Sequence, residues 1–328
     1  MCFGIEEVSV YLPEKRISIW DLNITEEEKN KAFQRNGMEF NYISENKSCS
    51  EMAYIAAEDI IRKSDLNPKD IDIIIYISGG EKDYCAWSAS AWIQNRLNAE
   101  RAIAYDLYQG CNSTVMAVML AINHLKSDES ISNVLIVGSD RFSTQVENGY
   151  LGGIMMGDAG EAILLKRGRG KFSVLSTSCL TDGRFSEMTY ALGGASSQIN
   201  YSILDNKNHY YQPRDTSKFS ILKEACVQNY INVIEKCLLK CNISLEDVKH
   251  IIFPNTSREL YYDILERLKY NVEATSLHNI SKFGHLGCVD AVNNLISAVN
   301  EKKLESGDKV ILTSMGVGLS WGALLLQV

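Results

Sequence analysis

Cys111 is the residue of this sequence best placed for covalent chemistry. It follows the strand-like run Tyr-Asp-Leu-Tyr at 105–108 and a glycine, and it opens the apolar helical pattern of residues 112–127. A helix N-terminus carries partial positive charge and free backbone N–H groups, which favour a thiolate. Such a thiolate can accept an acyl group as a thioester, and the same N–H groups can stabilise the oxyanion formed during the attack. The alternative is a small buried hydrophobic residue, the commonest fate of a free cysteine.

The elements around Cys111 occur twice in the chain. Short β-branched runs at 71–80 and 248–257 predict buried strands, and each follows a helical pattern and a polar junction. The two copies share an offset of 177 residues, which relates Asp70 to Asp247, Ser78 to Asn255 and Cys111 to Cys288. Each cysteine opens a helical pattern that leads to a further strand, at 132–140 and at 308–316. Each copy then ends in an aliphatic strand, at 160–167 and at 321–328.

This internal repeat predicts an α/β protein made of two similar halves. We expect an N-terminal half over residues 1–170, which contains the nucleophilic cysteine, and a C-terminal half over residues 171–328. Repeated strand–helix–strand units form sheets that are covered by helices on both faces. Cys288 occupies the duplicate position of Cys111, and we interpret it as a buried structural residue rather than a second reactive thiol.

The composition excludes several classes of function. The net charge is −8, which is opposite to the basic surface that a nucleic-acid-binding protein needs. No apolar run approaches the length of a membrane span, and the first residues do not resemble a signal peptide. Nine cysteines at irregular spacing indicate reduced thiols and a cytoplasmic protein. No cysteine–histidine cluster has the spacing of a metal site, so we predict no metal.

The order of several segments resembles the ketoacyl synthase III (beta-ketoacyl-acyl-carrier-protein synthase III) family of the thiolase superfamily. The segments are GIEEVSVYLPEKRIS near the start, NGMEFNYIS at 36–44, YDLYQGCNSTVMAV at 105–118, LIVGSD at 135–140, GDAGEAILL at 157–165, TDGR at 181–184 and GVGLSWGALLL at 316–326. They cover almost the whole chain and follow the family's order. The resemblance implies a thiolase-like duplicated αβαβα layered fold, a homodimer, and an active site between the two halves.

The same resemblance implies substrates and site residues. The acyl donor would be the phosphopantetheine thioester of coenzyme A or of an acyl carrier protein, with no tightly bound cofactor. The glycine-rich C-terminal block would place the backbone of Gly316, Val317 and Gly318 at the oxyanion, with Met315 in the wall of the acyl pocket. Trp87 would lie where the family's dimer interface meets the acyl tunnel, although an interface tryptophan without a gating role fits equally well.

The sequence departs from the family pattern at two positions. The family has His in a Pro-His-Gln-Ala-Asn block and Asn in a Gly-Asn-Thr-Ser block, whereas here the corresponding segments read FPNTS and FGHLG. Asn255 therefore stands at the histidine position and His285 at the asparagine position. His285 is our candidate general base, and Asn255 is our candidate donor to a thioester oxygen. Their alternatives are a structural histidine and a turn or cap residue.

The exchange leaves three functions open. A base beside an acyl-cysteine suits transfer of the acyl group to a hydroxyl, an amine or another nucleophile, in fatty-acid-like or specialised-metabolite biosynthesis. This is the reading that we narrowly favour. The first alternative is a carbon–carbon condensing 3-oxoacyl-ACP synthase III. The second is a catalytically silent thiolase-fold subunit, but the retention of Cys111 argues against it.

Overall fold

A computed structural model describes residues 3–168, 170–191 and 211–328. Nine strands of this part form one sheet in the order β13-β14-β15-β10-β1-β9-β6-β4-β5. Their bounds are β1 Phe3–Tyr11, β4 Ile73–Ser78, β5 Ile103–Tyr108, β6 Asn133–Arg141, β9 Asp158–Arg167, β10 Phe172–Thr181, β13 Val248–Ile252, β14 Lys309–Gly316 and β15 Ser320–Gln327. Three small two-stranded sheets are formed by β2 Lys15–Ser18 with β3 Phe40–Ile43, β7 Tyr150–Leu151 with β8 Ile154–Met155, and β11 Thr189–Tyr190 with β12 Gln212–Pro213.

The large sheet is duplicated about the pair of strands β1 and β10. On one side β1, β9 and β6 are antiparallel neighbours and β6 is parallel to β4. On the other side β10, β15 and β14 are antiparallel neighbours and β14 is parallel to β13. The predicted repeat is therefore confirmed. The second copy differs at its edge, where a single bridge between Ile251 and Thr275 stands in place of β5.

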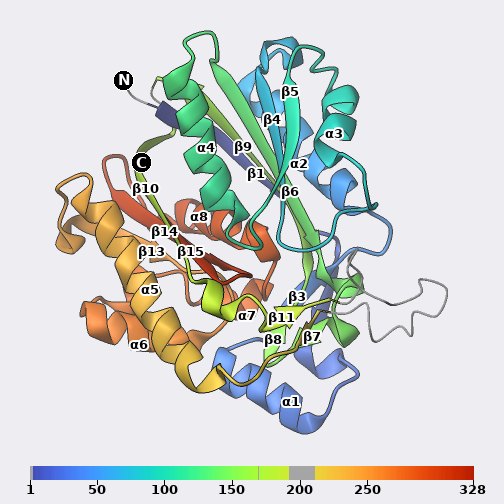
Figure 1. Cartoon of the computed structure of the whole chain (residues 1–328), viewed down its shortest axis with the longest axis vertical. Helices are drawn as coiled ribbons and strands as arrows, with labels where there is room; N and C mark the ends of the chain where they lie inside the picture. The colour runs from blue at the N-terminus through green and yellow to red at the C-terminus, as the bar shows by residue number, and fades with distance from the viewer. Residues whose placement is uncertain (1–2, 169, 192–210) are drawn as a thin grey trace.

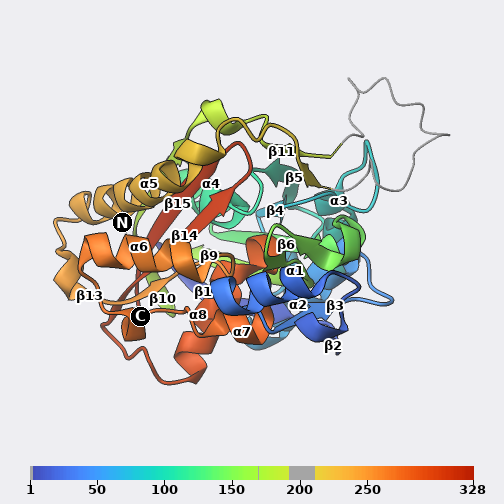
Figure 2. The ribbon, with the colours of Figure 1, turned by 90° about the horizontal axis from the view of Figure 1, so that it is seen from below.

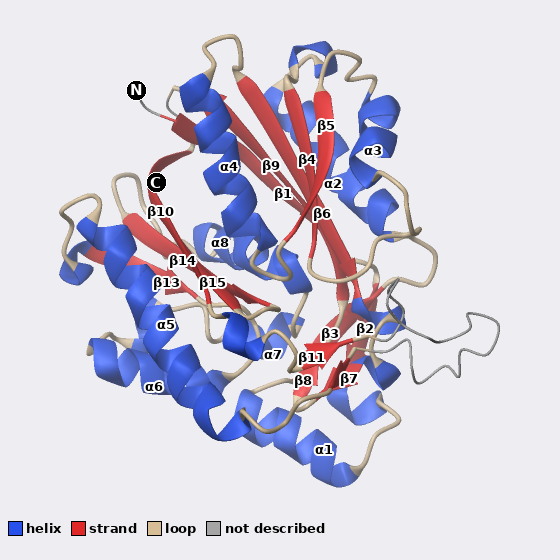
Figure 3. Ribbon diagram, viewed as in Figure 1, coloured by secondary structure: helices blue, strands red, loops and turns tan. Residues whose placement is uncertain are grey.

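Helices cover both faces of each half. Their bounds are α1 Glu26–Asn30, α2 Cys49–Ser64, α3 Ala89–Leu97, α4 Ser113–Ser127, α5 Phe219–Leu239, α6 Arg258–Leu268, α7 Asn279–Phe283 and α8 Asp290–Asn300. Figure 1 shows α4 and α8 between the two halves of the sheet, with α2 and α3 outside one half and α5 and α6 outside the other. The view from below places the two outer pairs at opposite ends of the molecule (Figure 2). The resulting order of helix, sheet, helix, sheet and helix is visible in Figure 3 and confirms the expected layered fold.

The alternation of side chains along each strand explains these layers. In β4, Ile73, Ile75 and Ile77 pack into the central cluster with α4, whereas Ile74 and Tyr76 pack against α2 and α3. Successive side chains of a strand point to opposite faces, so a strand buried on both sides reads as a continuous apolar run. This is why the short β-branched runs predicted strands correctly.

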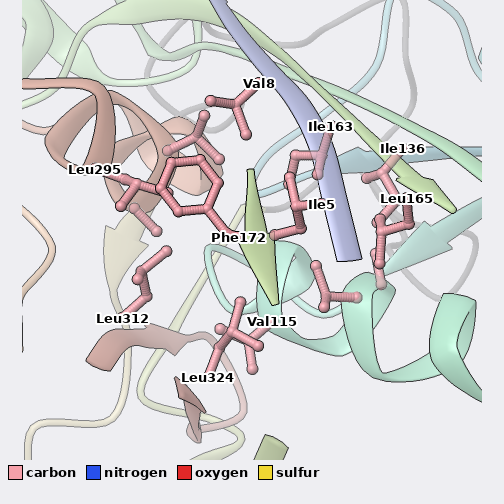
Figure 4. Packing of buried hydrophobic residues seen from close by; sticks show 14 of the residues in the cluster. Ile5, Val8, Val115, Ile136, Ile163, Leu165, Phe172, Leu295, Leu312 and Leu324 are labelled. Carbon is pink, nitrogen blue, oxygen red and sulfur yellow. The ribbon is translucent and has the colours of Figure 1, made fainter. Parts of the chain in front are cut away.

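The central cluster joins the two halves. Leu312 and Leu324 from the C-terminal half pack in the same cluster as Ile136 and Ile163 from the N-terminal half. Figure 4 shows these side chains around Phe172, with Val115 of α4 nearby. Residues on α4 and α8 are thus held in fixed positions relative to each other by shared apolar packing.

We predict that Leu324→Ala lowers the free energy of unfolding by about 2–5 kcal/mol, because it leaves a cavity in this cluster. The matched change Leu239→Ala, at a side chain that is 79% exposed, should cost less than about 0.5 kcal/mol. Denaturant unfolding of the two variants measures the difference. Equal losses would contradict the assignment of the core.

Candidate active site

Cys111 lies in a tight turn between β5 and α4. Gly110 has a φ of +58°, and a Cβ added there would lie 2.6 Å from the backbone nitrogen of Val317. The turn therefore needs glycine both for its left-handed backbone and for the close approach of the C-terminal loop. A Cβ at Gly316 would lie 3.1 Å from the nitrogen of Cys111. The segment Gly316–Gly318 consequently packs directly on the cysteine turn, as its proposed role requires.

His285 reaches Cys111 from the other half of the protein. Its Nε2 lies 3.5 Å from Cys111 Sγ. The residue follows α7 and Gly284, its own N–H donates to the Met155 carbonyl at 2.9 Å, and its ring stacks on Phe142 at 6.0 Å between centroids. Backbone and ring contacts thus fix the imidazole, which is 5% exposed.

Asp290 completes a cysteine–histidine–aspartate arrangement. One carboxylate oxygen, Oδ2, lies 2.5 Å from His285 Nδ1 and also accepts the Asn255 N–H at 2.7 Å. The other, Oδ1, accepts the Leu286 N–H at 2.8 Å. A carboxylate at Nδ1 holds a proton there and leaves Nε2 free to accept the proton of the thiol. Sequence reasoning missed this residue, although an acidic residue at the start of a helix, five positions after His285, was a usable signal.

The pKa values of the pair follow from burial and charge. Burial lowers the pKa of His285, but the charge of Asp290 and the contact with Cys111 outweigh burial and raise this pKa well above its usual range. Burial raises the pKa of the Cys111 thiol, and the charge of His285 opposes this effect. A strong buried base beside a buried thiol is an arrangement that transfers a proton when the thiol attacks a substrate.

Asn255 is fully buried, and its backbone N–H is bonded to the carboxylate that holds His285. It follows β13, which ends at Ile252 shortly before Pro254, a residue that lacks the N–H needed for a ladder bond. Its Oδ1 accepts from Asn294 Nδ2 at 2.9 Å, while its own Nδ2 is buried with no hydrogen-bond partner in the described part of the chain. An unpaired buried donor has a free-energy cost unless a ligand supplies an acceptor.

Comparisons with known proteins identify the family of the chain. The family model of 3-oxoacyl-[acyl-carrier-protein (ACP)] synthase III matches residues 105–183, and the model of the C-terminal part of the same synthase matches residues 238–328. Cys111 lies in the first match, and His285 and Asp290 lie in the second. The chain belongs to the ketoacyl synthase III family of the thiolase superfamily.

Relatives in this family match the chain along almost its full length. A beta-ketoacyl-[acyl-carrier-protein] synthase III from Aquifex aeolicus (strain VF5) is 25% identical over 320 residues, which are 97% of each protein. One from Wolbachia pipientis wMel is 26% identical over 322 residues, 97% of this chain and 96% of the relative.

Two solved structures have the same fold. The crystal structure of 3-oxoacyl-[acyl-carrier-protein] synthase III from Aquifex aeolicus VF5 has a TM-score of 0.83, at 24% identity and 99% and 100% coverage of this chain and of that one. The structure of ChlB3, described as an acyltransferase, has a TM-score of 0.86, at 22% identity and 100% and 98% coverage.

The hydrophobic residues next to Cys111 differ from those expected by analogy with the synthase III family. Phe142, Val146 and Met156 form a small buried cluster against which Cys111, Leu151, Ile154 and Tyr211 pack. Sequence reasoning did not find this cluster, because its members come from the irregular segment between β6 and β9 and, for Tyr211, from a distant loop.

Met315 and Trp87 lie elsewhere. Met315 faces α5, where its Sδ is 3.8 Å from Cys226 Sγ, and it belongs to the outer cluster beneath that helix. Trp87 packs edge-on to Tyr84, with 5.2 Å between ring centroids, in the cluster of α2 and α3. The structure thus groups neither residue with Cys111, and their assignment to the acyl pocket gains no support from these contacts. Cys288 is 1% exposed, as a structural residue would be.

The described residues contain no group of three or more histidine, cysteine, aspartate or glutamate side chains arranged to hold a metal ion. Within the same ranges, none of the helices combines the length and the apolar character needed to cross a bilayer.

We predict that Asp290→Asn slows alkylation of Cys111 by iodoacetamide by about 10²–10⁴-fold at neutral pH. The amide removes the charge that raises the pKa of His285, so the imidazole becomes a weaker base and the thiolate becomes rarer. Peptide mass spectrometry after timed alkylation measures the rate at Cys111. The surface change Asp263→Asn is the control and should leave the rate unchanged; an unchanged rate in Asp290→Asn would disprove the role of the carboxylate.

Proposed function

We propose that this chain is an acyltransferase that forms an acyl thioester on Cys111 and passes the acyl group to a hydroxyl, an amine or another nucleophile. The donor in this proposal is the phosphopantetheine thioester of coenzyme A or of an acyl carrier protein. The observation that carries it is the chain of contacts from Cys111 through His285 to Asp290. The relatives named synthase III support an acyl carrier as partner.

The first half-reaction needs a base and then an acid. His285 Nε2 accepts the thiol proton of Cys111 as the sulfur attacks the thioester carbonyl. The tetrahedral oxyanion collapses, the bond to the phosphopantetheine sulfur breaks, and the proton on His285 passes to that leaving sulfur. The enzyme is then acylated, and His285 is neutral again.

The second half-reaction repeats these steps with the acceptor. The acceptor hydroxyl or amine loses its proton to His285 Nε2 as its oxygen or nitrogen attacks the acyl carbon. The bond to Cys111 breaks, and the sulfur takes the proton back from the imidazole. Asp290 stays ionised throughout and stabilises the imidazolium formed in each step.

Two groups are proposed to stabilise the oxyanion. The first is the set of backbone N–H groups at the start of α4, next to the sulfur, together with those of the segment Gly316–Gly318, which packs on the same turn. Preorganised donors are most effective at such a place. Asn255 Nδ2 is the other donor, because it is buried without a partner and a substrate oxygen would satisfy it.

The arrangement at His285 favours an acceptor that carries a proton. A hydroxyl or amine must be deprotonated as it attacks, and Asp290 makes the imidazole a stronger base for this step. Decarboxylation of a malonyl thioester removes no proton, but it needs donors to the thioester oxygen. In this site the Nδ1 proton of His285 is already directed to Asp290, which suits base catalysis.

Carbon–carbon condensation is the second candidate, and the comparisons favour it over transfer to a heteroatom. The curated relatives from Aquifex aeolicus and Wolbachia pipientis are both named beta-ketoacyl-[acyl-carrier-protein] synthase III. Both candidates share the first half-reaction on Cys111, so the acceptor is what separates them.

The test is intact-protein mass spectrometry after incubation with acyl-coenzyme A and acyl-carrier donors. We expect an acyl adduct on the wild-type chain and none on Cys111→Ala, with His285→Ala acylated at least about 10²-fold more slowly. Cys179→Ala, which changes a cysteine outside the site, should be acylated as wild type. Absence of an adduct with every donor would indicate a silent subunit.

A malonyl donor then separates the two candidates. Transfer to a heteroatom predicts no carbon dioxide when malonyl-coenzyme A or malonyl-carrier protein is added to the acylated chain, and loss of the adduct when hydroxyl or amine acceptors are added. Release of carbon dioxide in step with the loss of the adduct would instead establish condensation.

We also propose that the chain forms a homodimer. In the described ranges β5 pairs with β4 alone, and Ile103 and Tyr108 on it are 66% and 56% exposed. An unpaired strand edge with exposed apolar side chains is a surface that a second copy can cover. Sedimentation equilibrium should therefore give twice the chain mass of 36.7 kDa, and Ile103→Lys should shift the chain toward the monomer. A wild-type chain that sediments as a monomer would rule the dimer out.

A further inference from the structure

Glu161 is a buried carboxyl group that the proposed chemistry does not use. It lies on β9 in a stretch of otherwise small or apolar residues, and it is fully buried. Two other buried carboxylates, Asp140 and Asp290, influence it electrostatically. Three carboxyl groups in one buried region raise the question of which of them carry charge.

The three carboxyl groups differ in the hydrogen-bond donors that they meet. Asp140 accepts N–H groups from Gly79, Gly80 and Cys288, each at 2.8 Å. Asp290 accepts two backbone N–H groups and contacts the His285 ring, as described above. Glu161 meets only a hydroxyl, and its Oε2 has no partner in the described part of the chain. Burial raises the pKa of Asp140 and its backbone N–H donors lower it, whereas Glu161 has no backbone donor to stabilise a negative charge.

The contacts of the Thr114 hydroxyl bear on whether Glu161 carries a proton. Its Oγ1 lies 2.8 Å from Glu161 Oε1 and 2.8 Å from the carbonyl oxygen of Cys288. The hydroxyl has one proton, and the carbonyl can only accept. If Thr114 donates this proton to the Cys288 carbonyl, its contact with Glu161 is a hydrogen bond only when Glu161 donates a proton of its own to the Thr114 oxygen.

We propose that Glu161 is held as a neutral carboxylic acid and that, through Thr114, it positions the segment of His285 against the helix of Cys111. Thr114 stands three residues after Cys111, and Cys288 stands three residues after His285. The bond between them therefore fixes the distance between the thiol and its base. The N–H of Cys288 is held by Asp140, so both backbone polar groups of this residue are hydrogen-bonded. Glu161 is a positioning residue in this account, and its role in acyl transfer rests on the function proposed for Cys111.

The surroundings of Glu161 agree with a bound proton. Burial raises the pKa of Glu161 to about 8, and the charges of Asp140 and Asp290 act in the same direction, whereas the hydrogen bond that Thr114 can donate to the ionised form lowers this pKa. The ionisable groups that face this region are Asp140 from β6, Asp290 from α8, and the thiols of Cys111 and Cys288. His285, the basic side chain of the region, is bound to Asp290. Above about pH 8 the ionised carboxylate of Glu161 would accept the hydrogen bond of the Thr114 hydroxyl, and the Cys288 carbonyl would lose its donor.

The experiment compares wild type with Glu161→Gln, which has the same shape, can still donate to Thr114 and cannot ionise. The full-length chain is alkylated with iodoacetamide over a pH series, and the rate at Cys111 is measured by peptide mass spectrometry. We expect the ratio of the wild-type to the variant rate to fall on the order of tenfold as the pH rises through about 8. A ratio that stays constant would overturn the positioning role.

Thr114 provides the matched pair of variants. Thr114→Val removes the hydroxyl and should slow alkylation at every pH on the order of tenfold, whereas Thr114→Ser keeps the hydroxyl and should restore the rate. Equal rates in all three proteins would also contradict the proposal. Because alkylation needs no acyl donor, this outcome is separate from a failure of the acyl-transfer test.

Infrared difference spectroscopy observes the proton directly. Wild type minus Glu161→Gln should show the carbonyl stretch of a protonated carboxylic acid below about pH 8 and lose it above. The free energy of unfolding of wild type should also decrease as the pH rises through this range. A raised folded-state pKa stabilises wild type fully below the unfolded value, and this stabilisation is lost as the pH rises through about 8. Absence of the carbonyl band would show that Glu161 is ionised.

Discussion

The short contact between Asp290 and His285 is the interaction on which the rest of the site depends. One carboxylate fixes the tautomer of the imidazole, raises its pKa, and accepts the backbone N–H of Asn255 and of Leu286. A buried charge is tolerated only where such partners surround it. The loop after β13 and the loop after α7 are thus held together by the group that makes His285 a base.

The duplicated fold explains why this base reaches a cysteine 174 residues away. The helix that begins after Cys111 and the helix that begins at Asp290 occupy equivalent places in the two copies and share one apolar layer. Close approach there needs glycine, because a Cβ at Gly79 would lie 2.9 Å from Cys111 Sγ and one at Gly287 would lie 1.9 Å from Asp140. The two copies have diverged in chemistry while keeping this packing.

Sequence reasoning found what repeats and missed what is irregular. Local apolar patterns predicted the strands β4 and β13, the helices α4 and α8 and the offset of 177 residues. The strand patterns are continuous in the sequence because both faces of these strands are buried. Asp290 was missed because its contact with His285 depends on the turn between them, which a helical pattern does not encode, although its place at the start of a helix was a usable signal. The cluster of Phe142, Val146 and Met156 depends on how an irregular segment folds back over Cys111, which periodicity does not encode.

The position of Asp290 explains why the histidine is useful at position 285 rather than at position 255. A histidine at position 285 has a carboxylate within reach of Nδ1, whereas position 255 has its backbone N–H on that carboxylate and its side chain on Asn294. An imidazole at position 285 is therefore supported as a base by Asp290. The base serves the attack of Cys111 with any acceptor, and it also serves the second half-reaction when the acceptor has a proton to give, as the proposed hydroxyl or amine does.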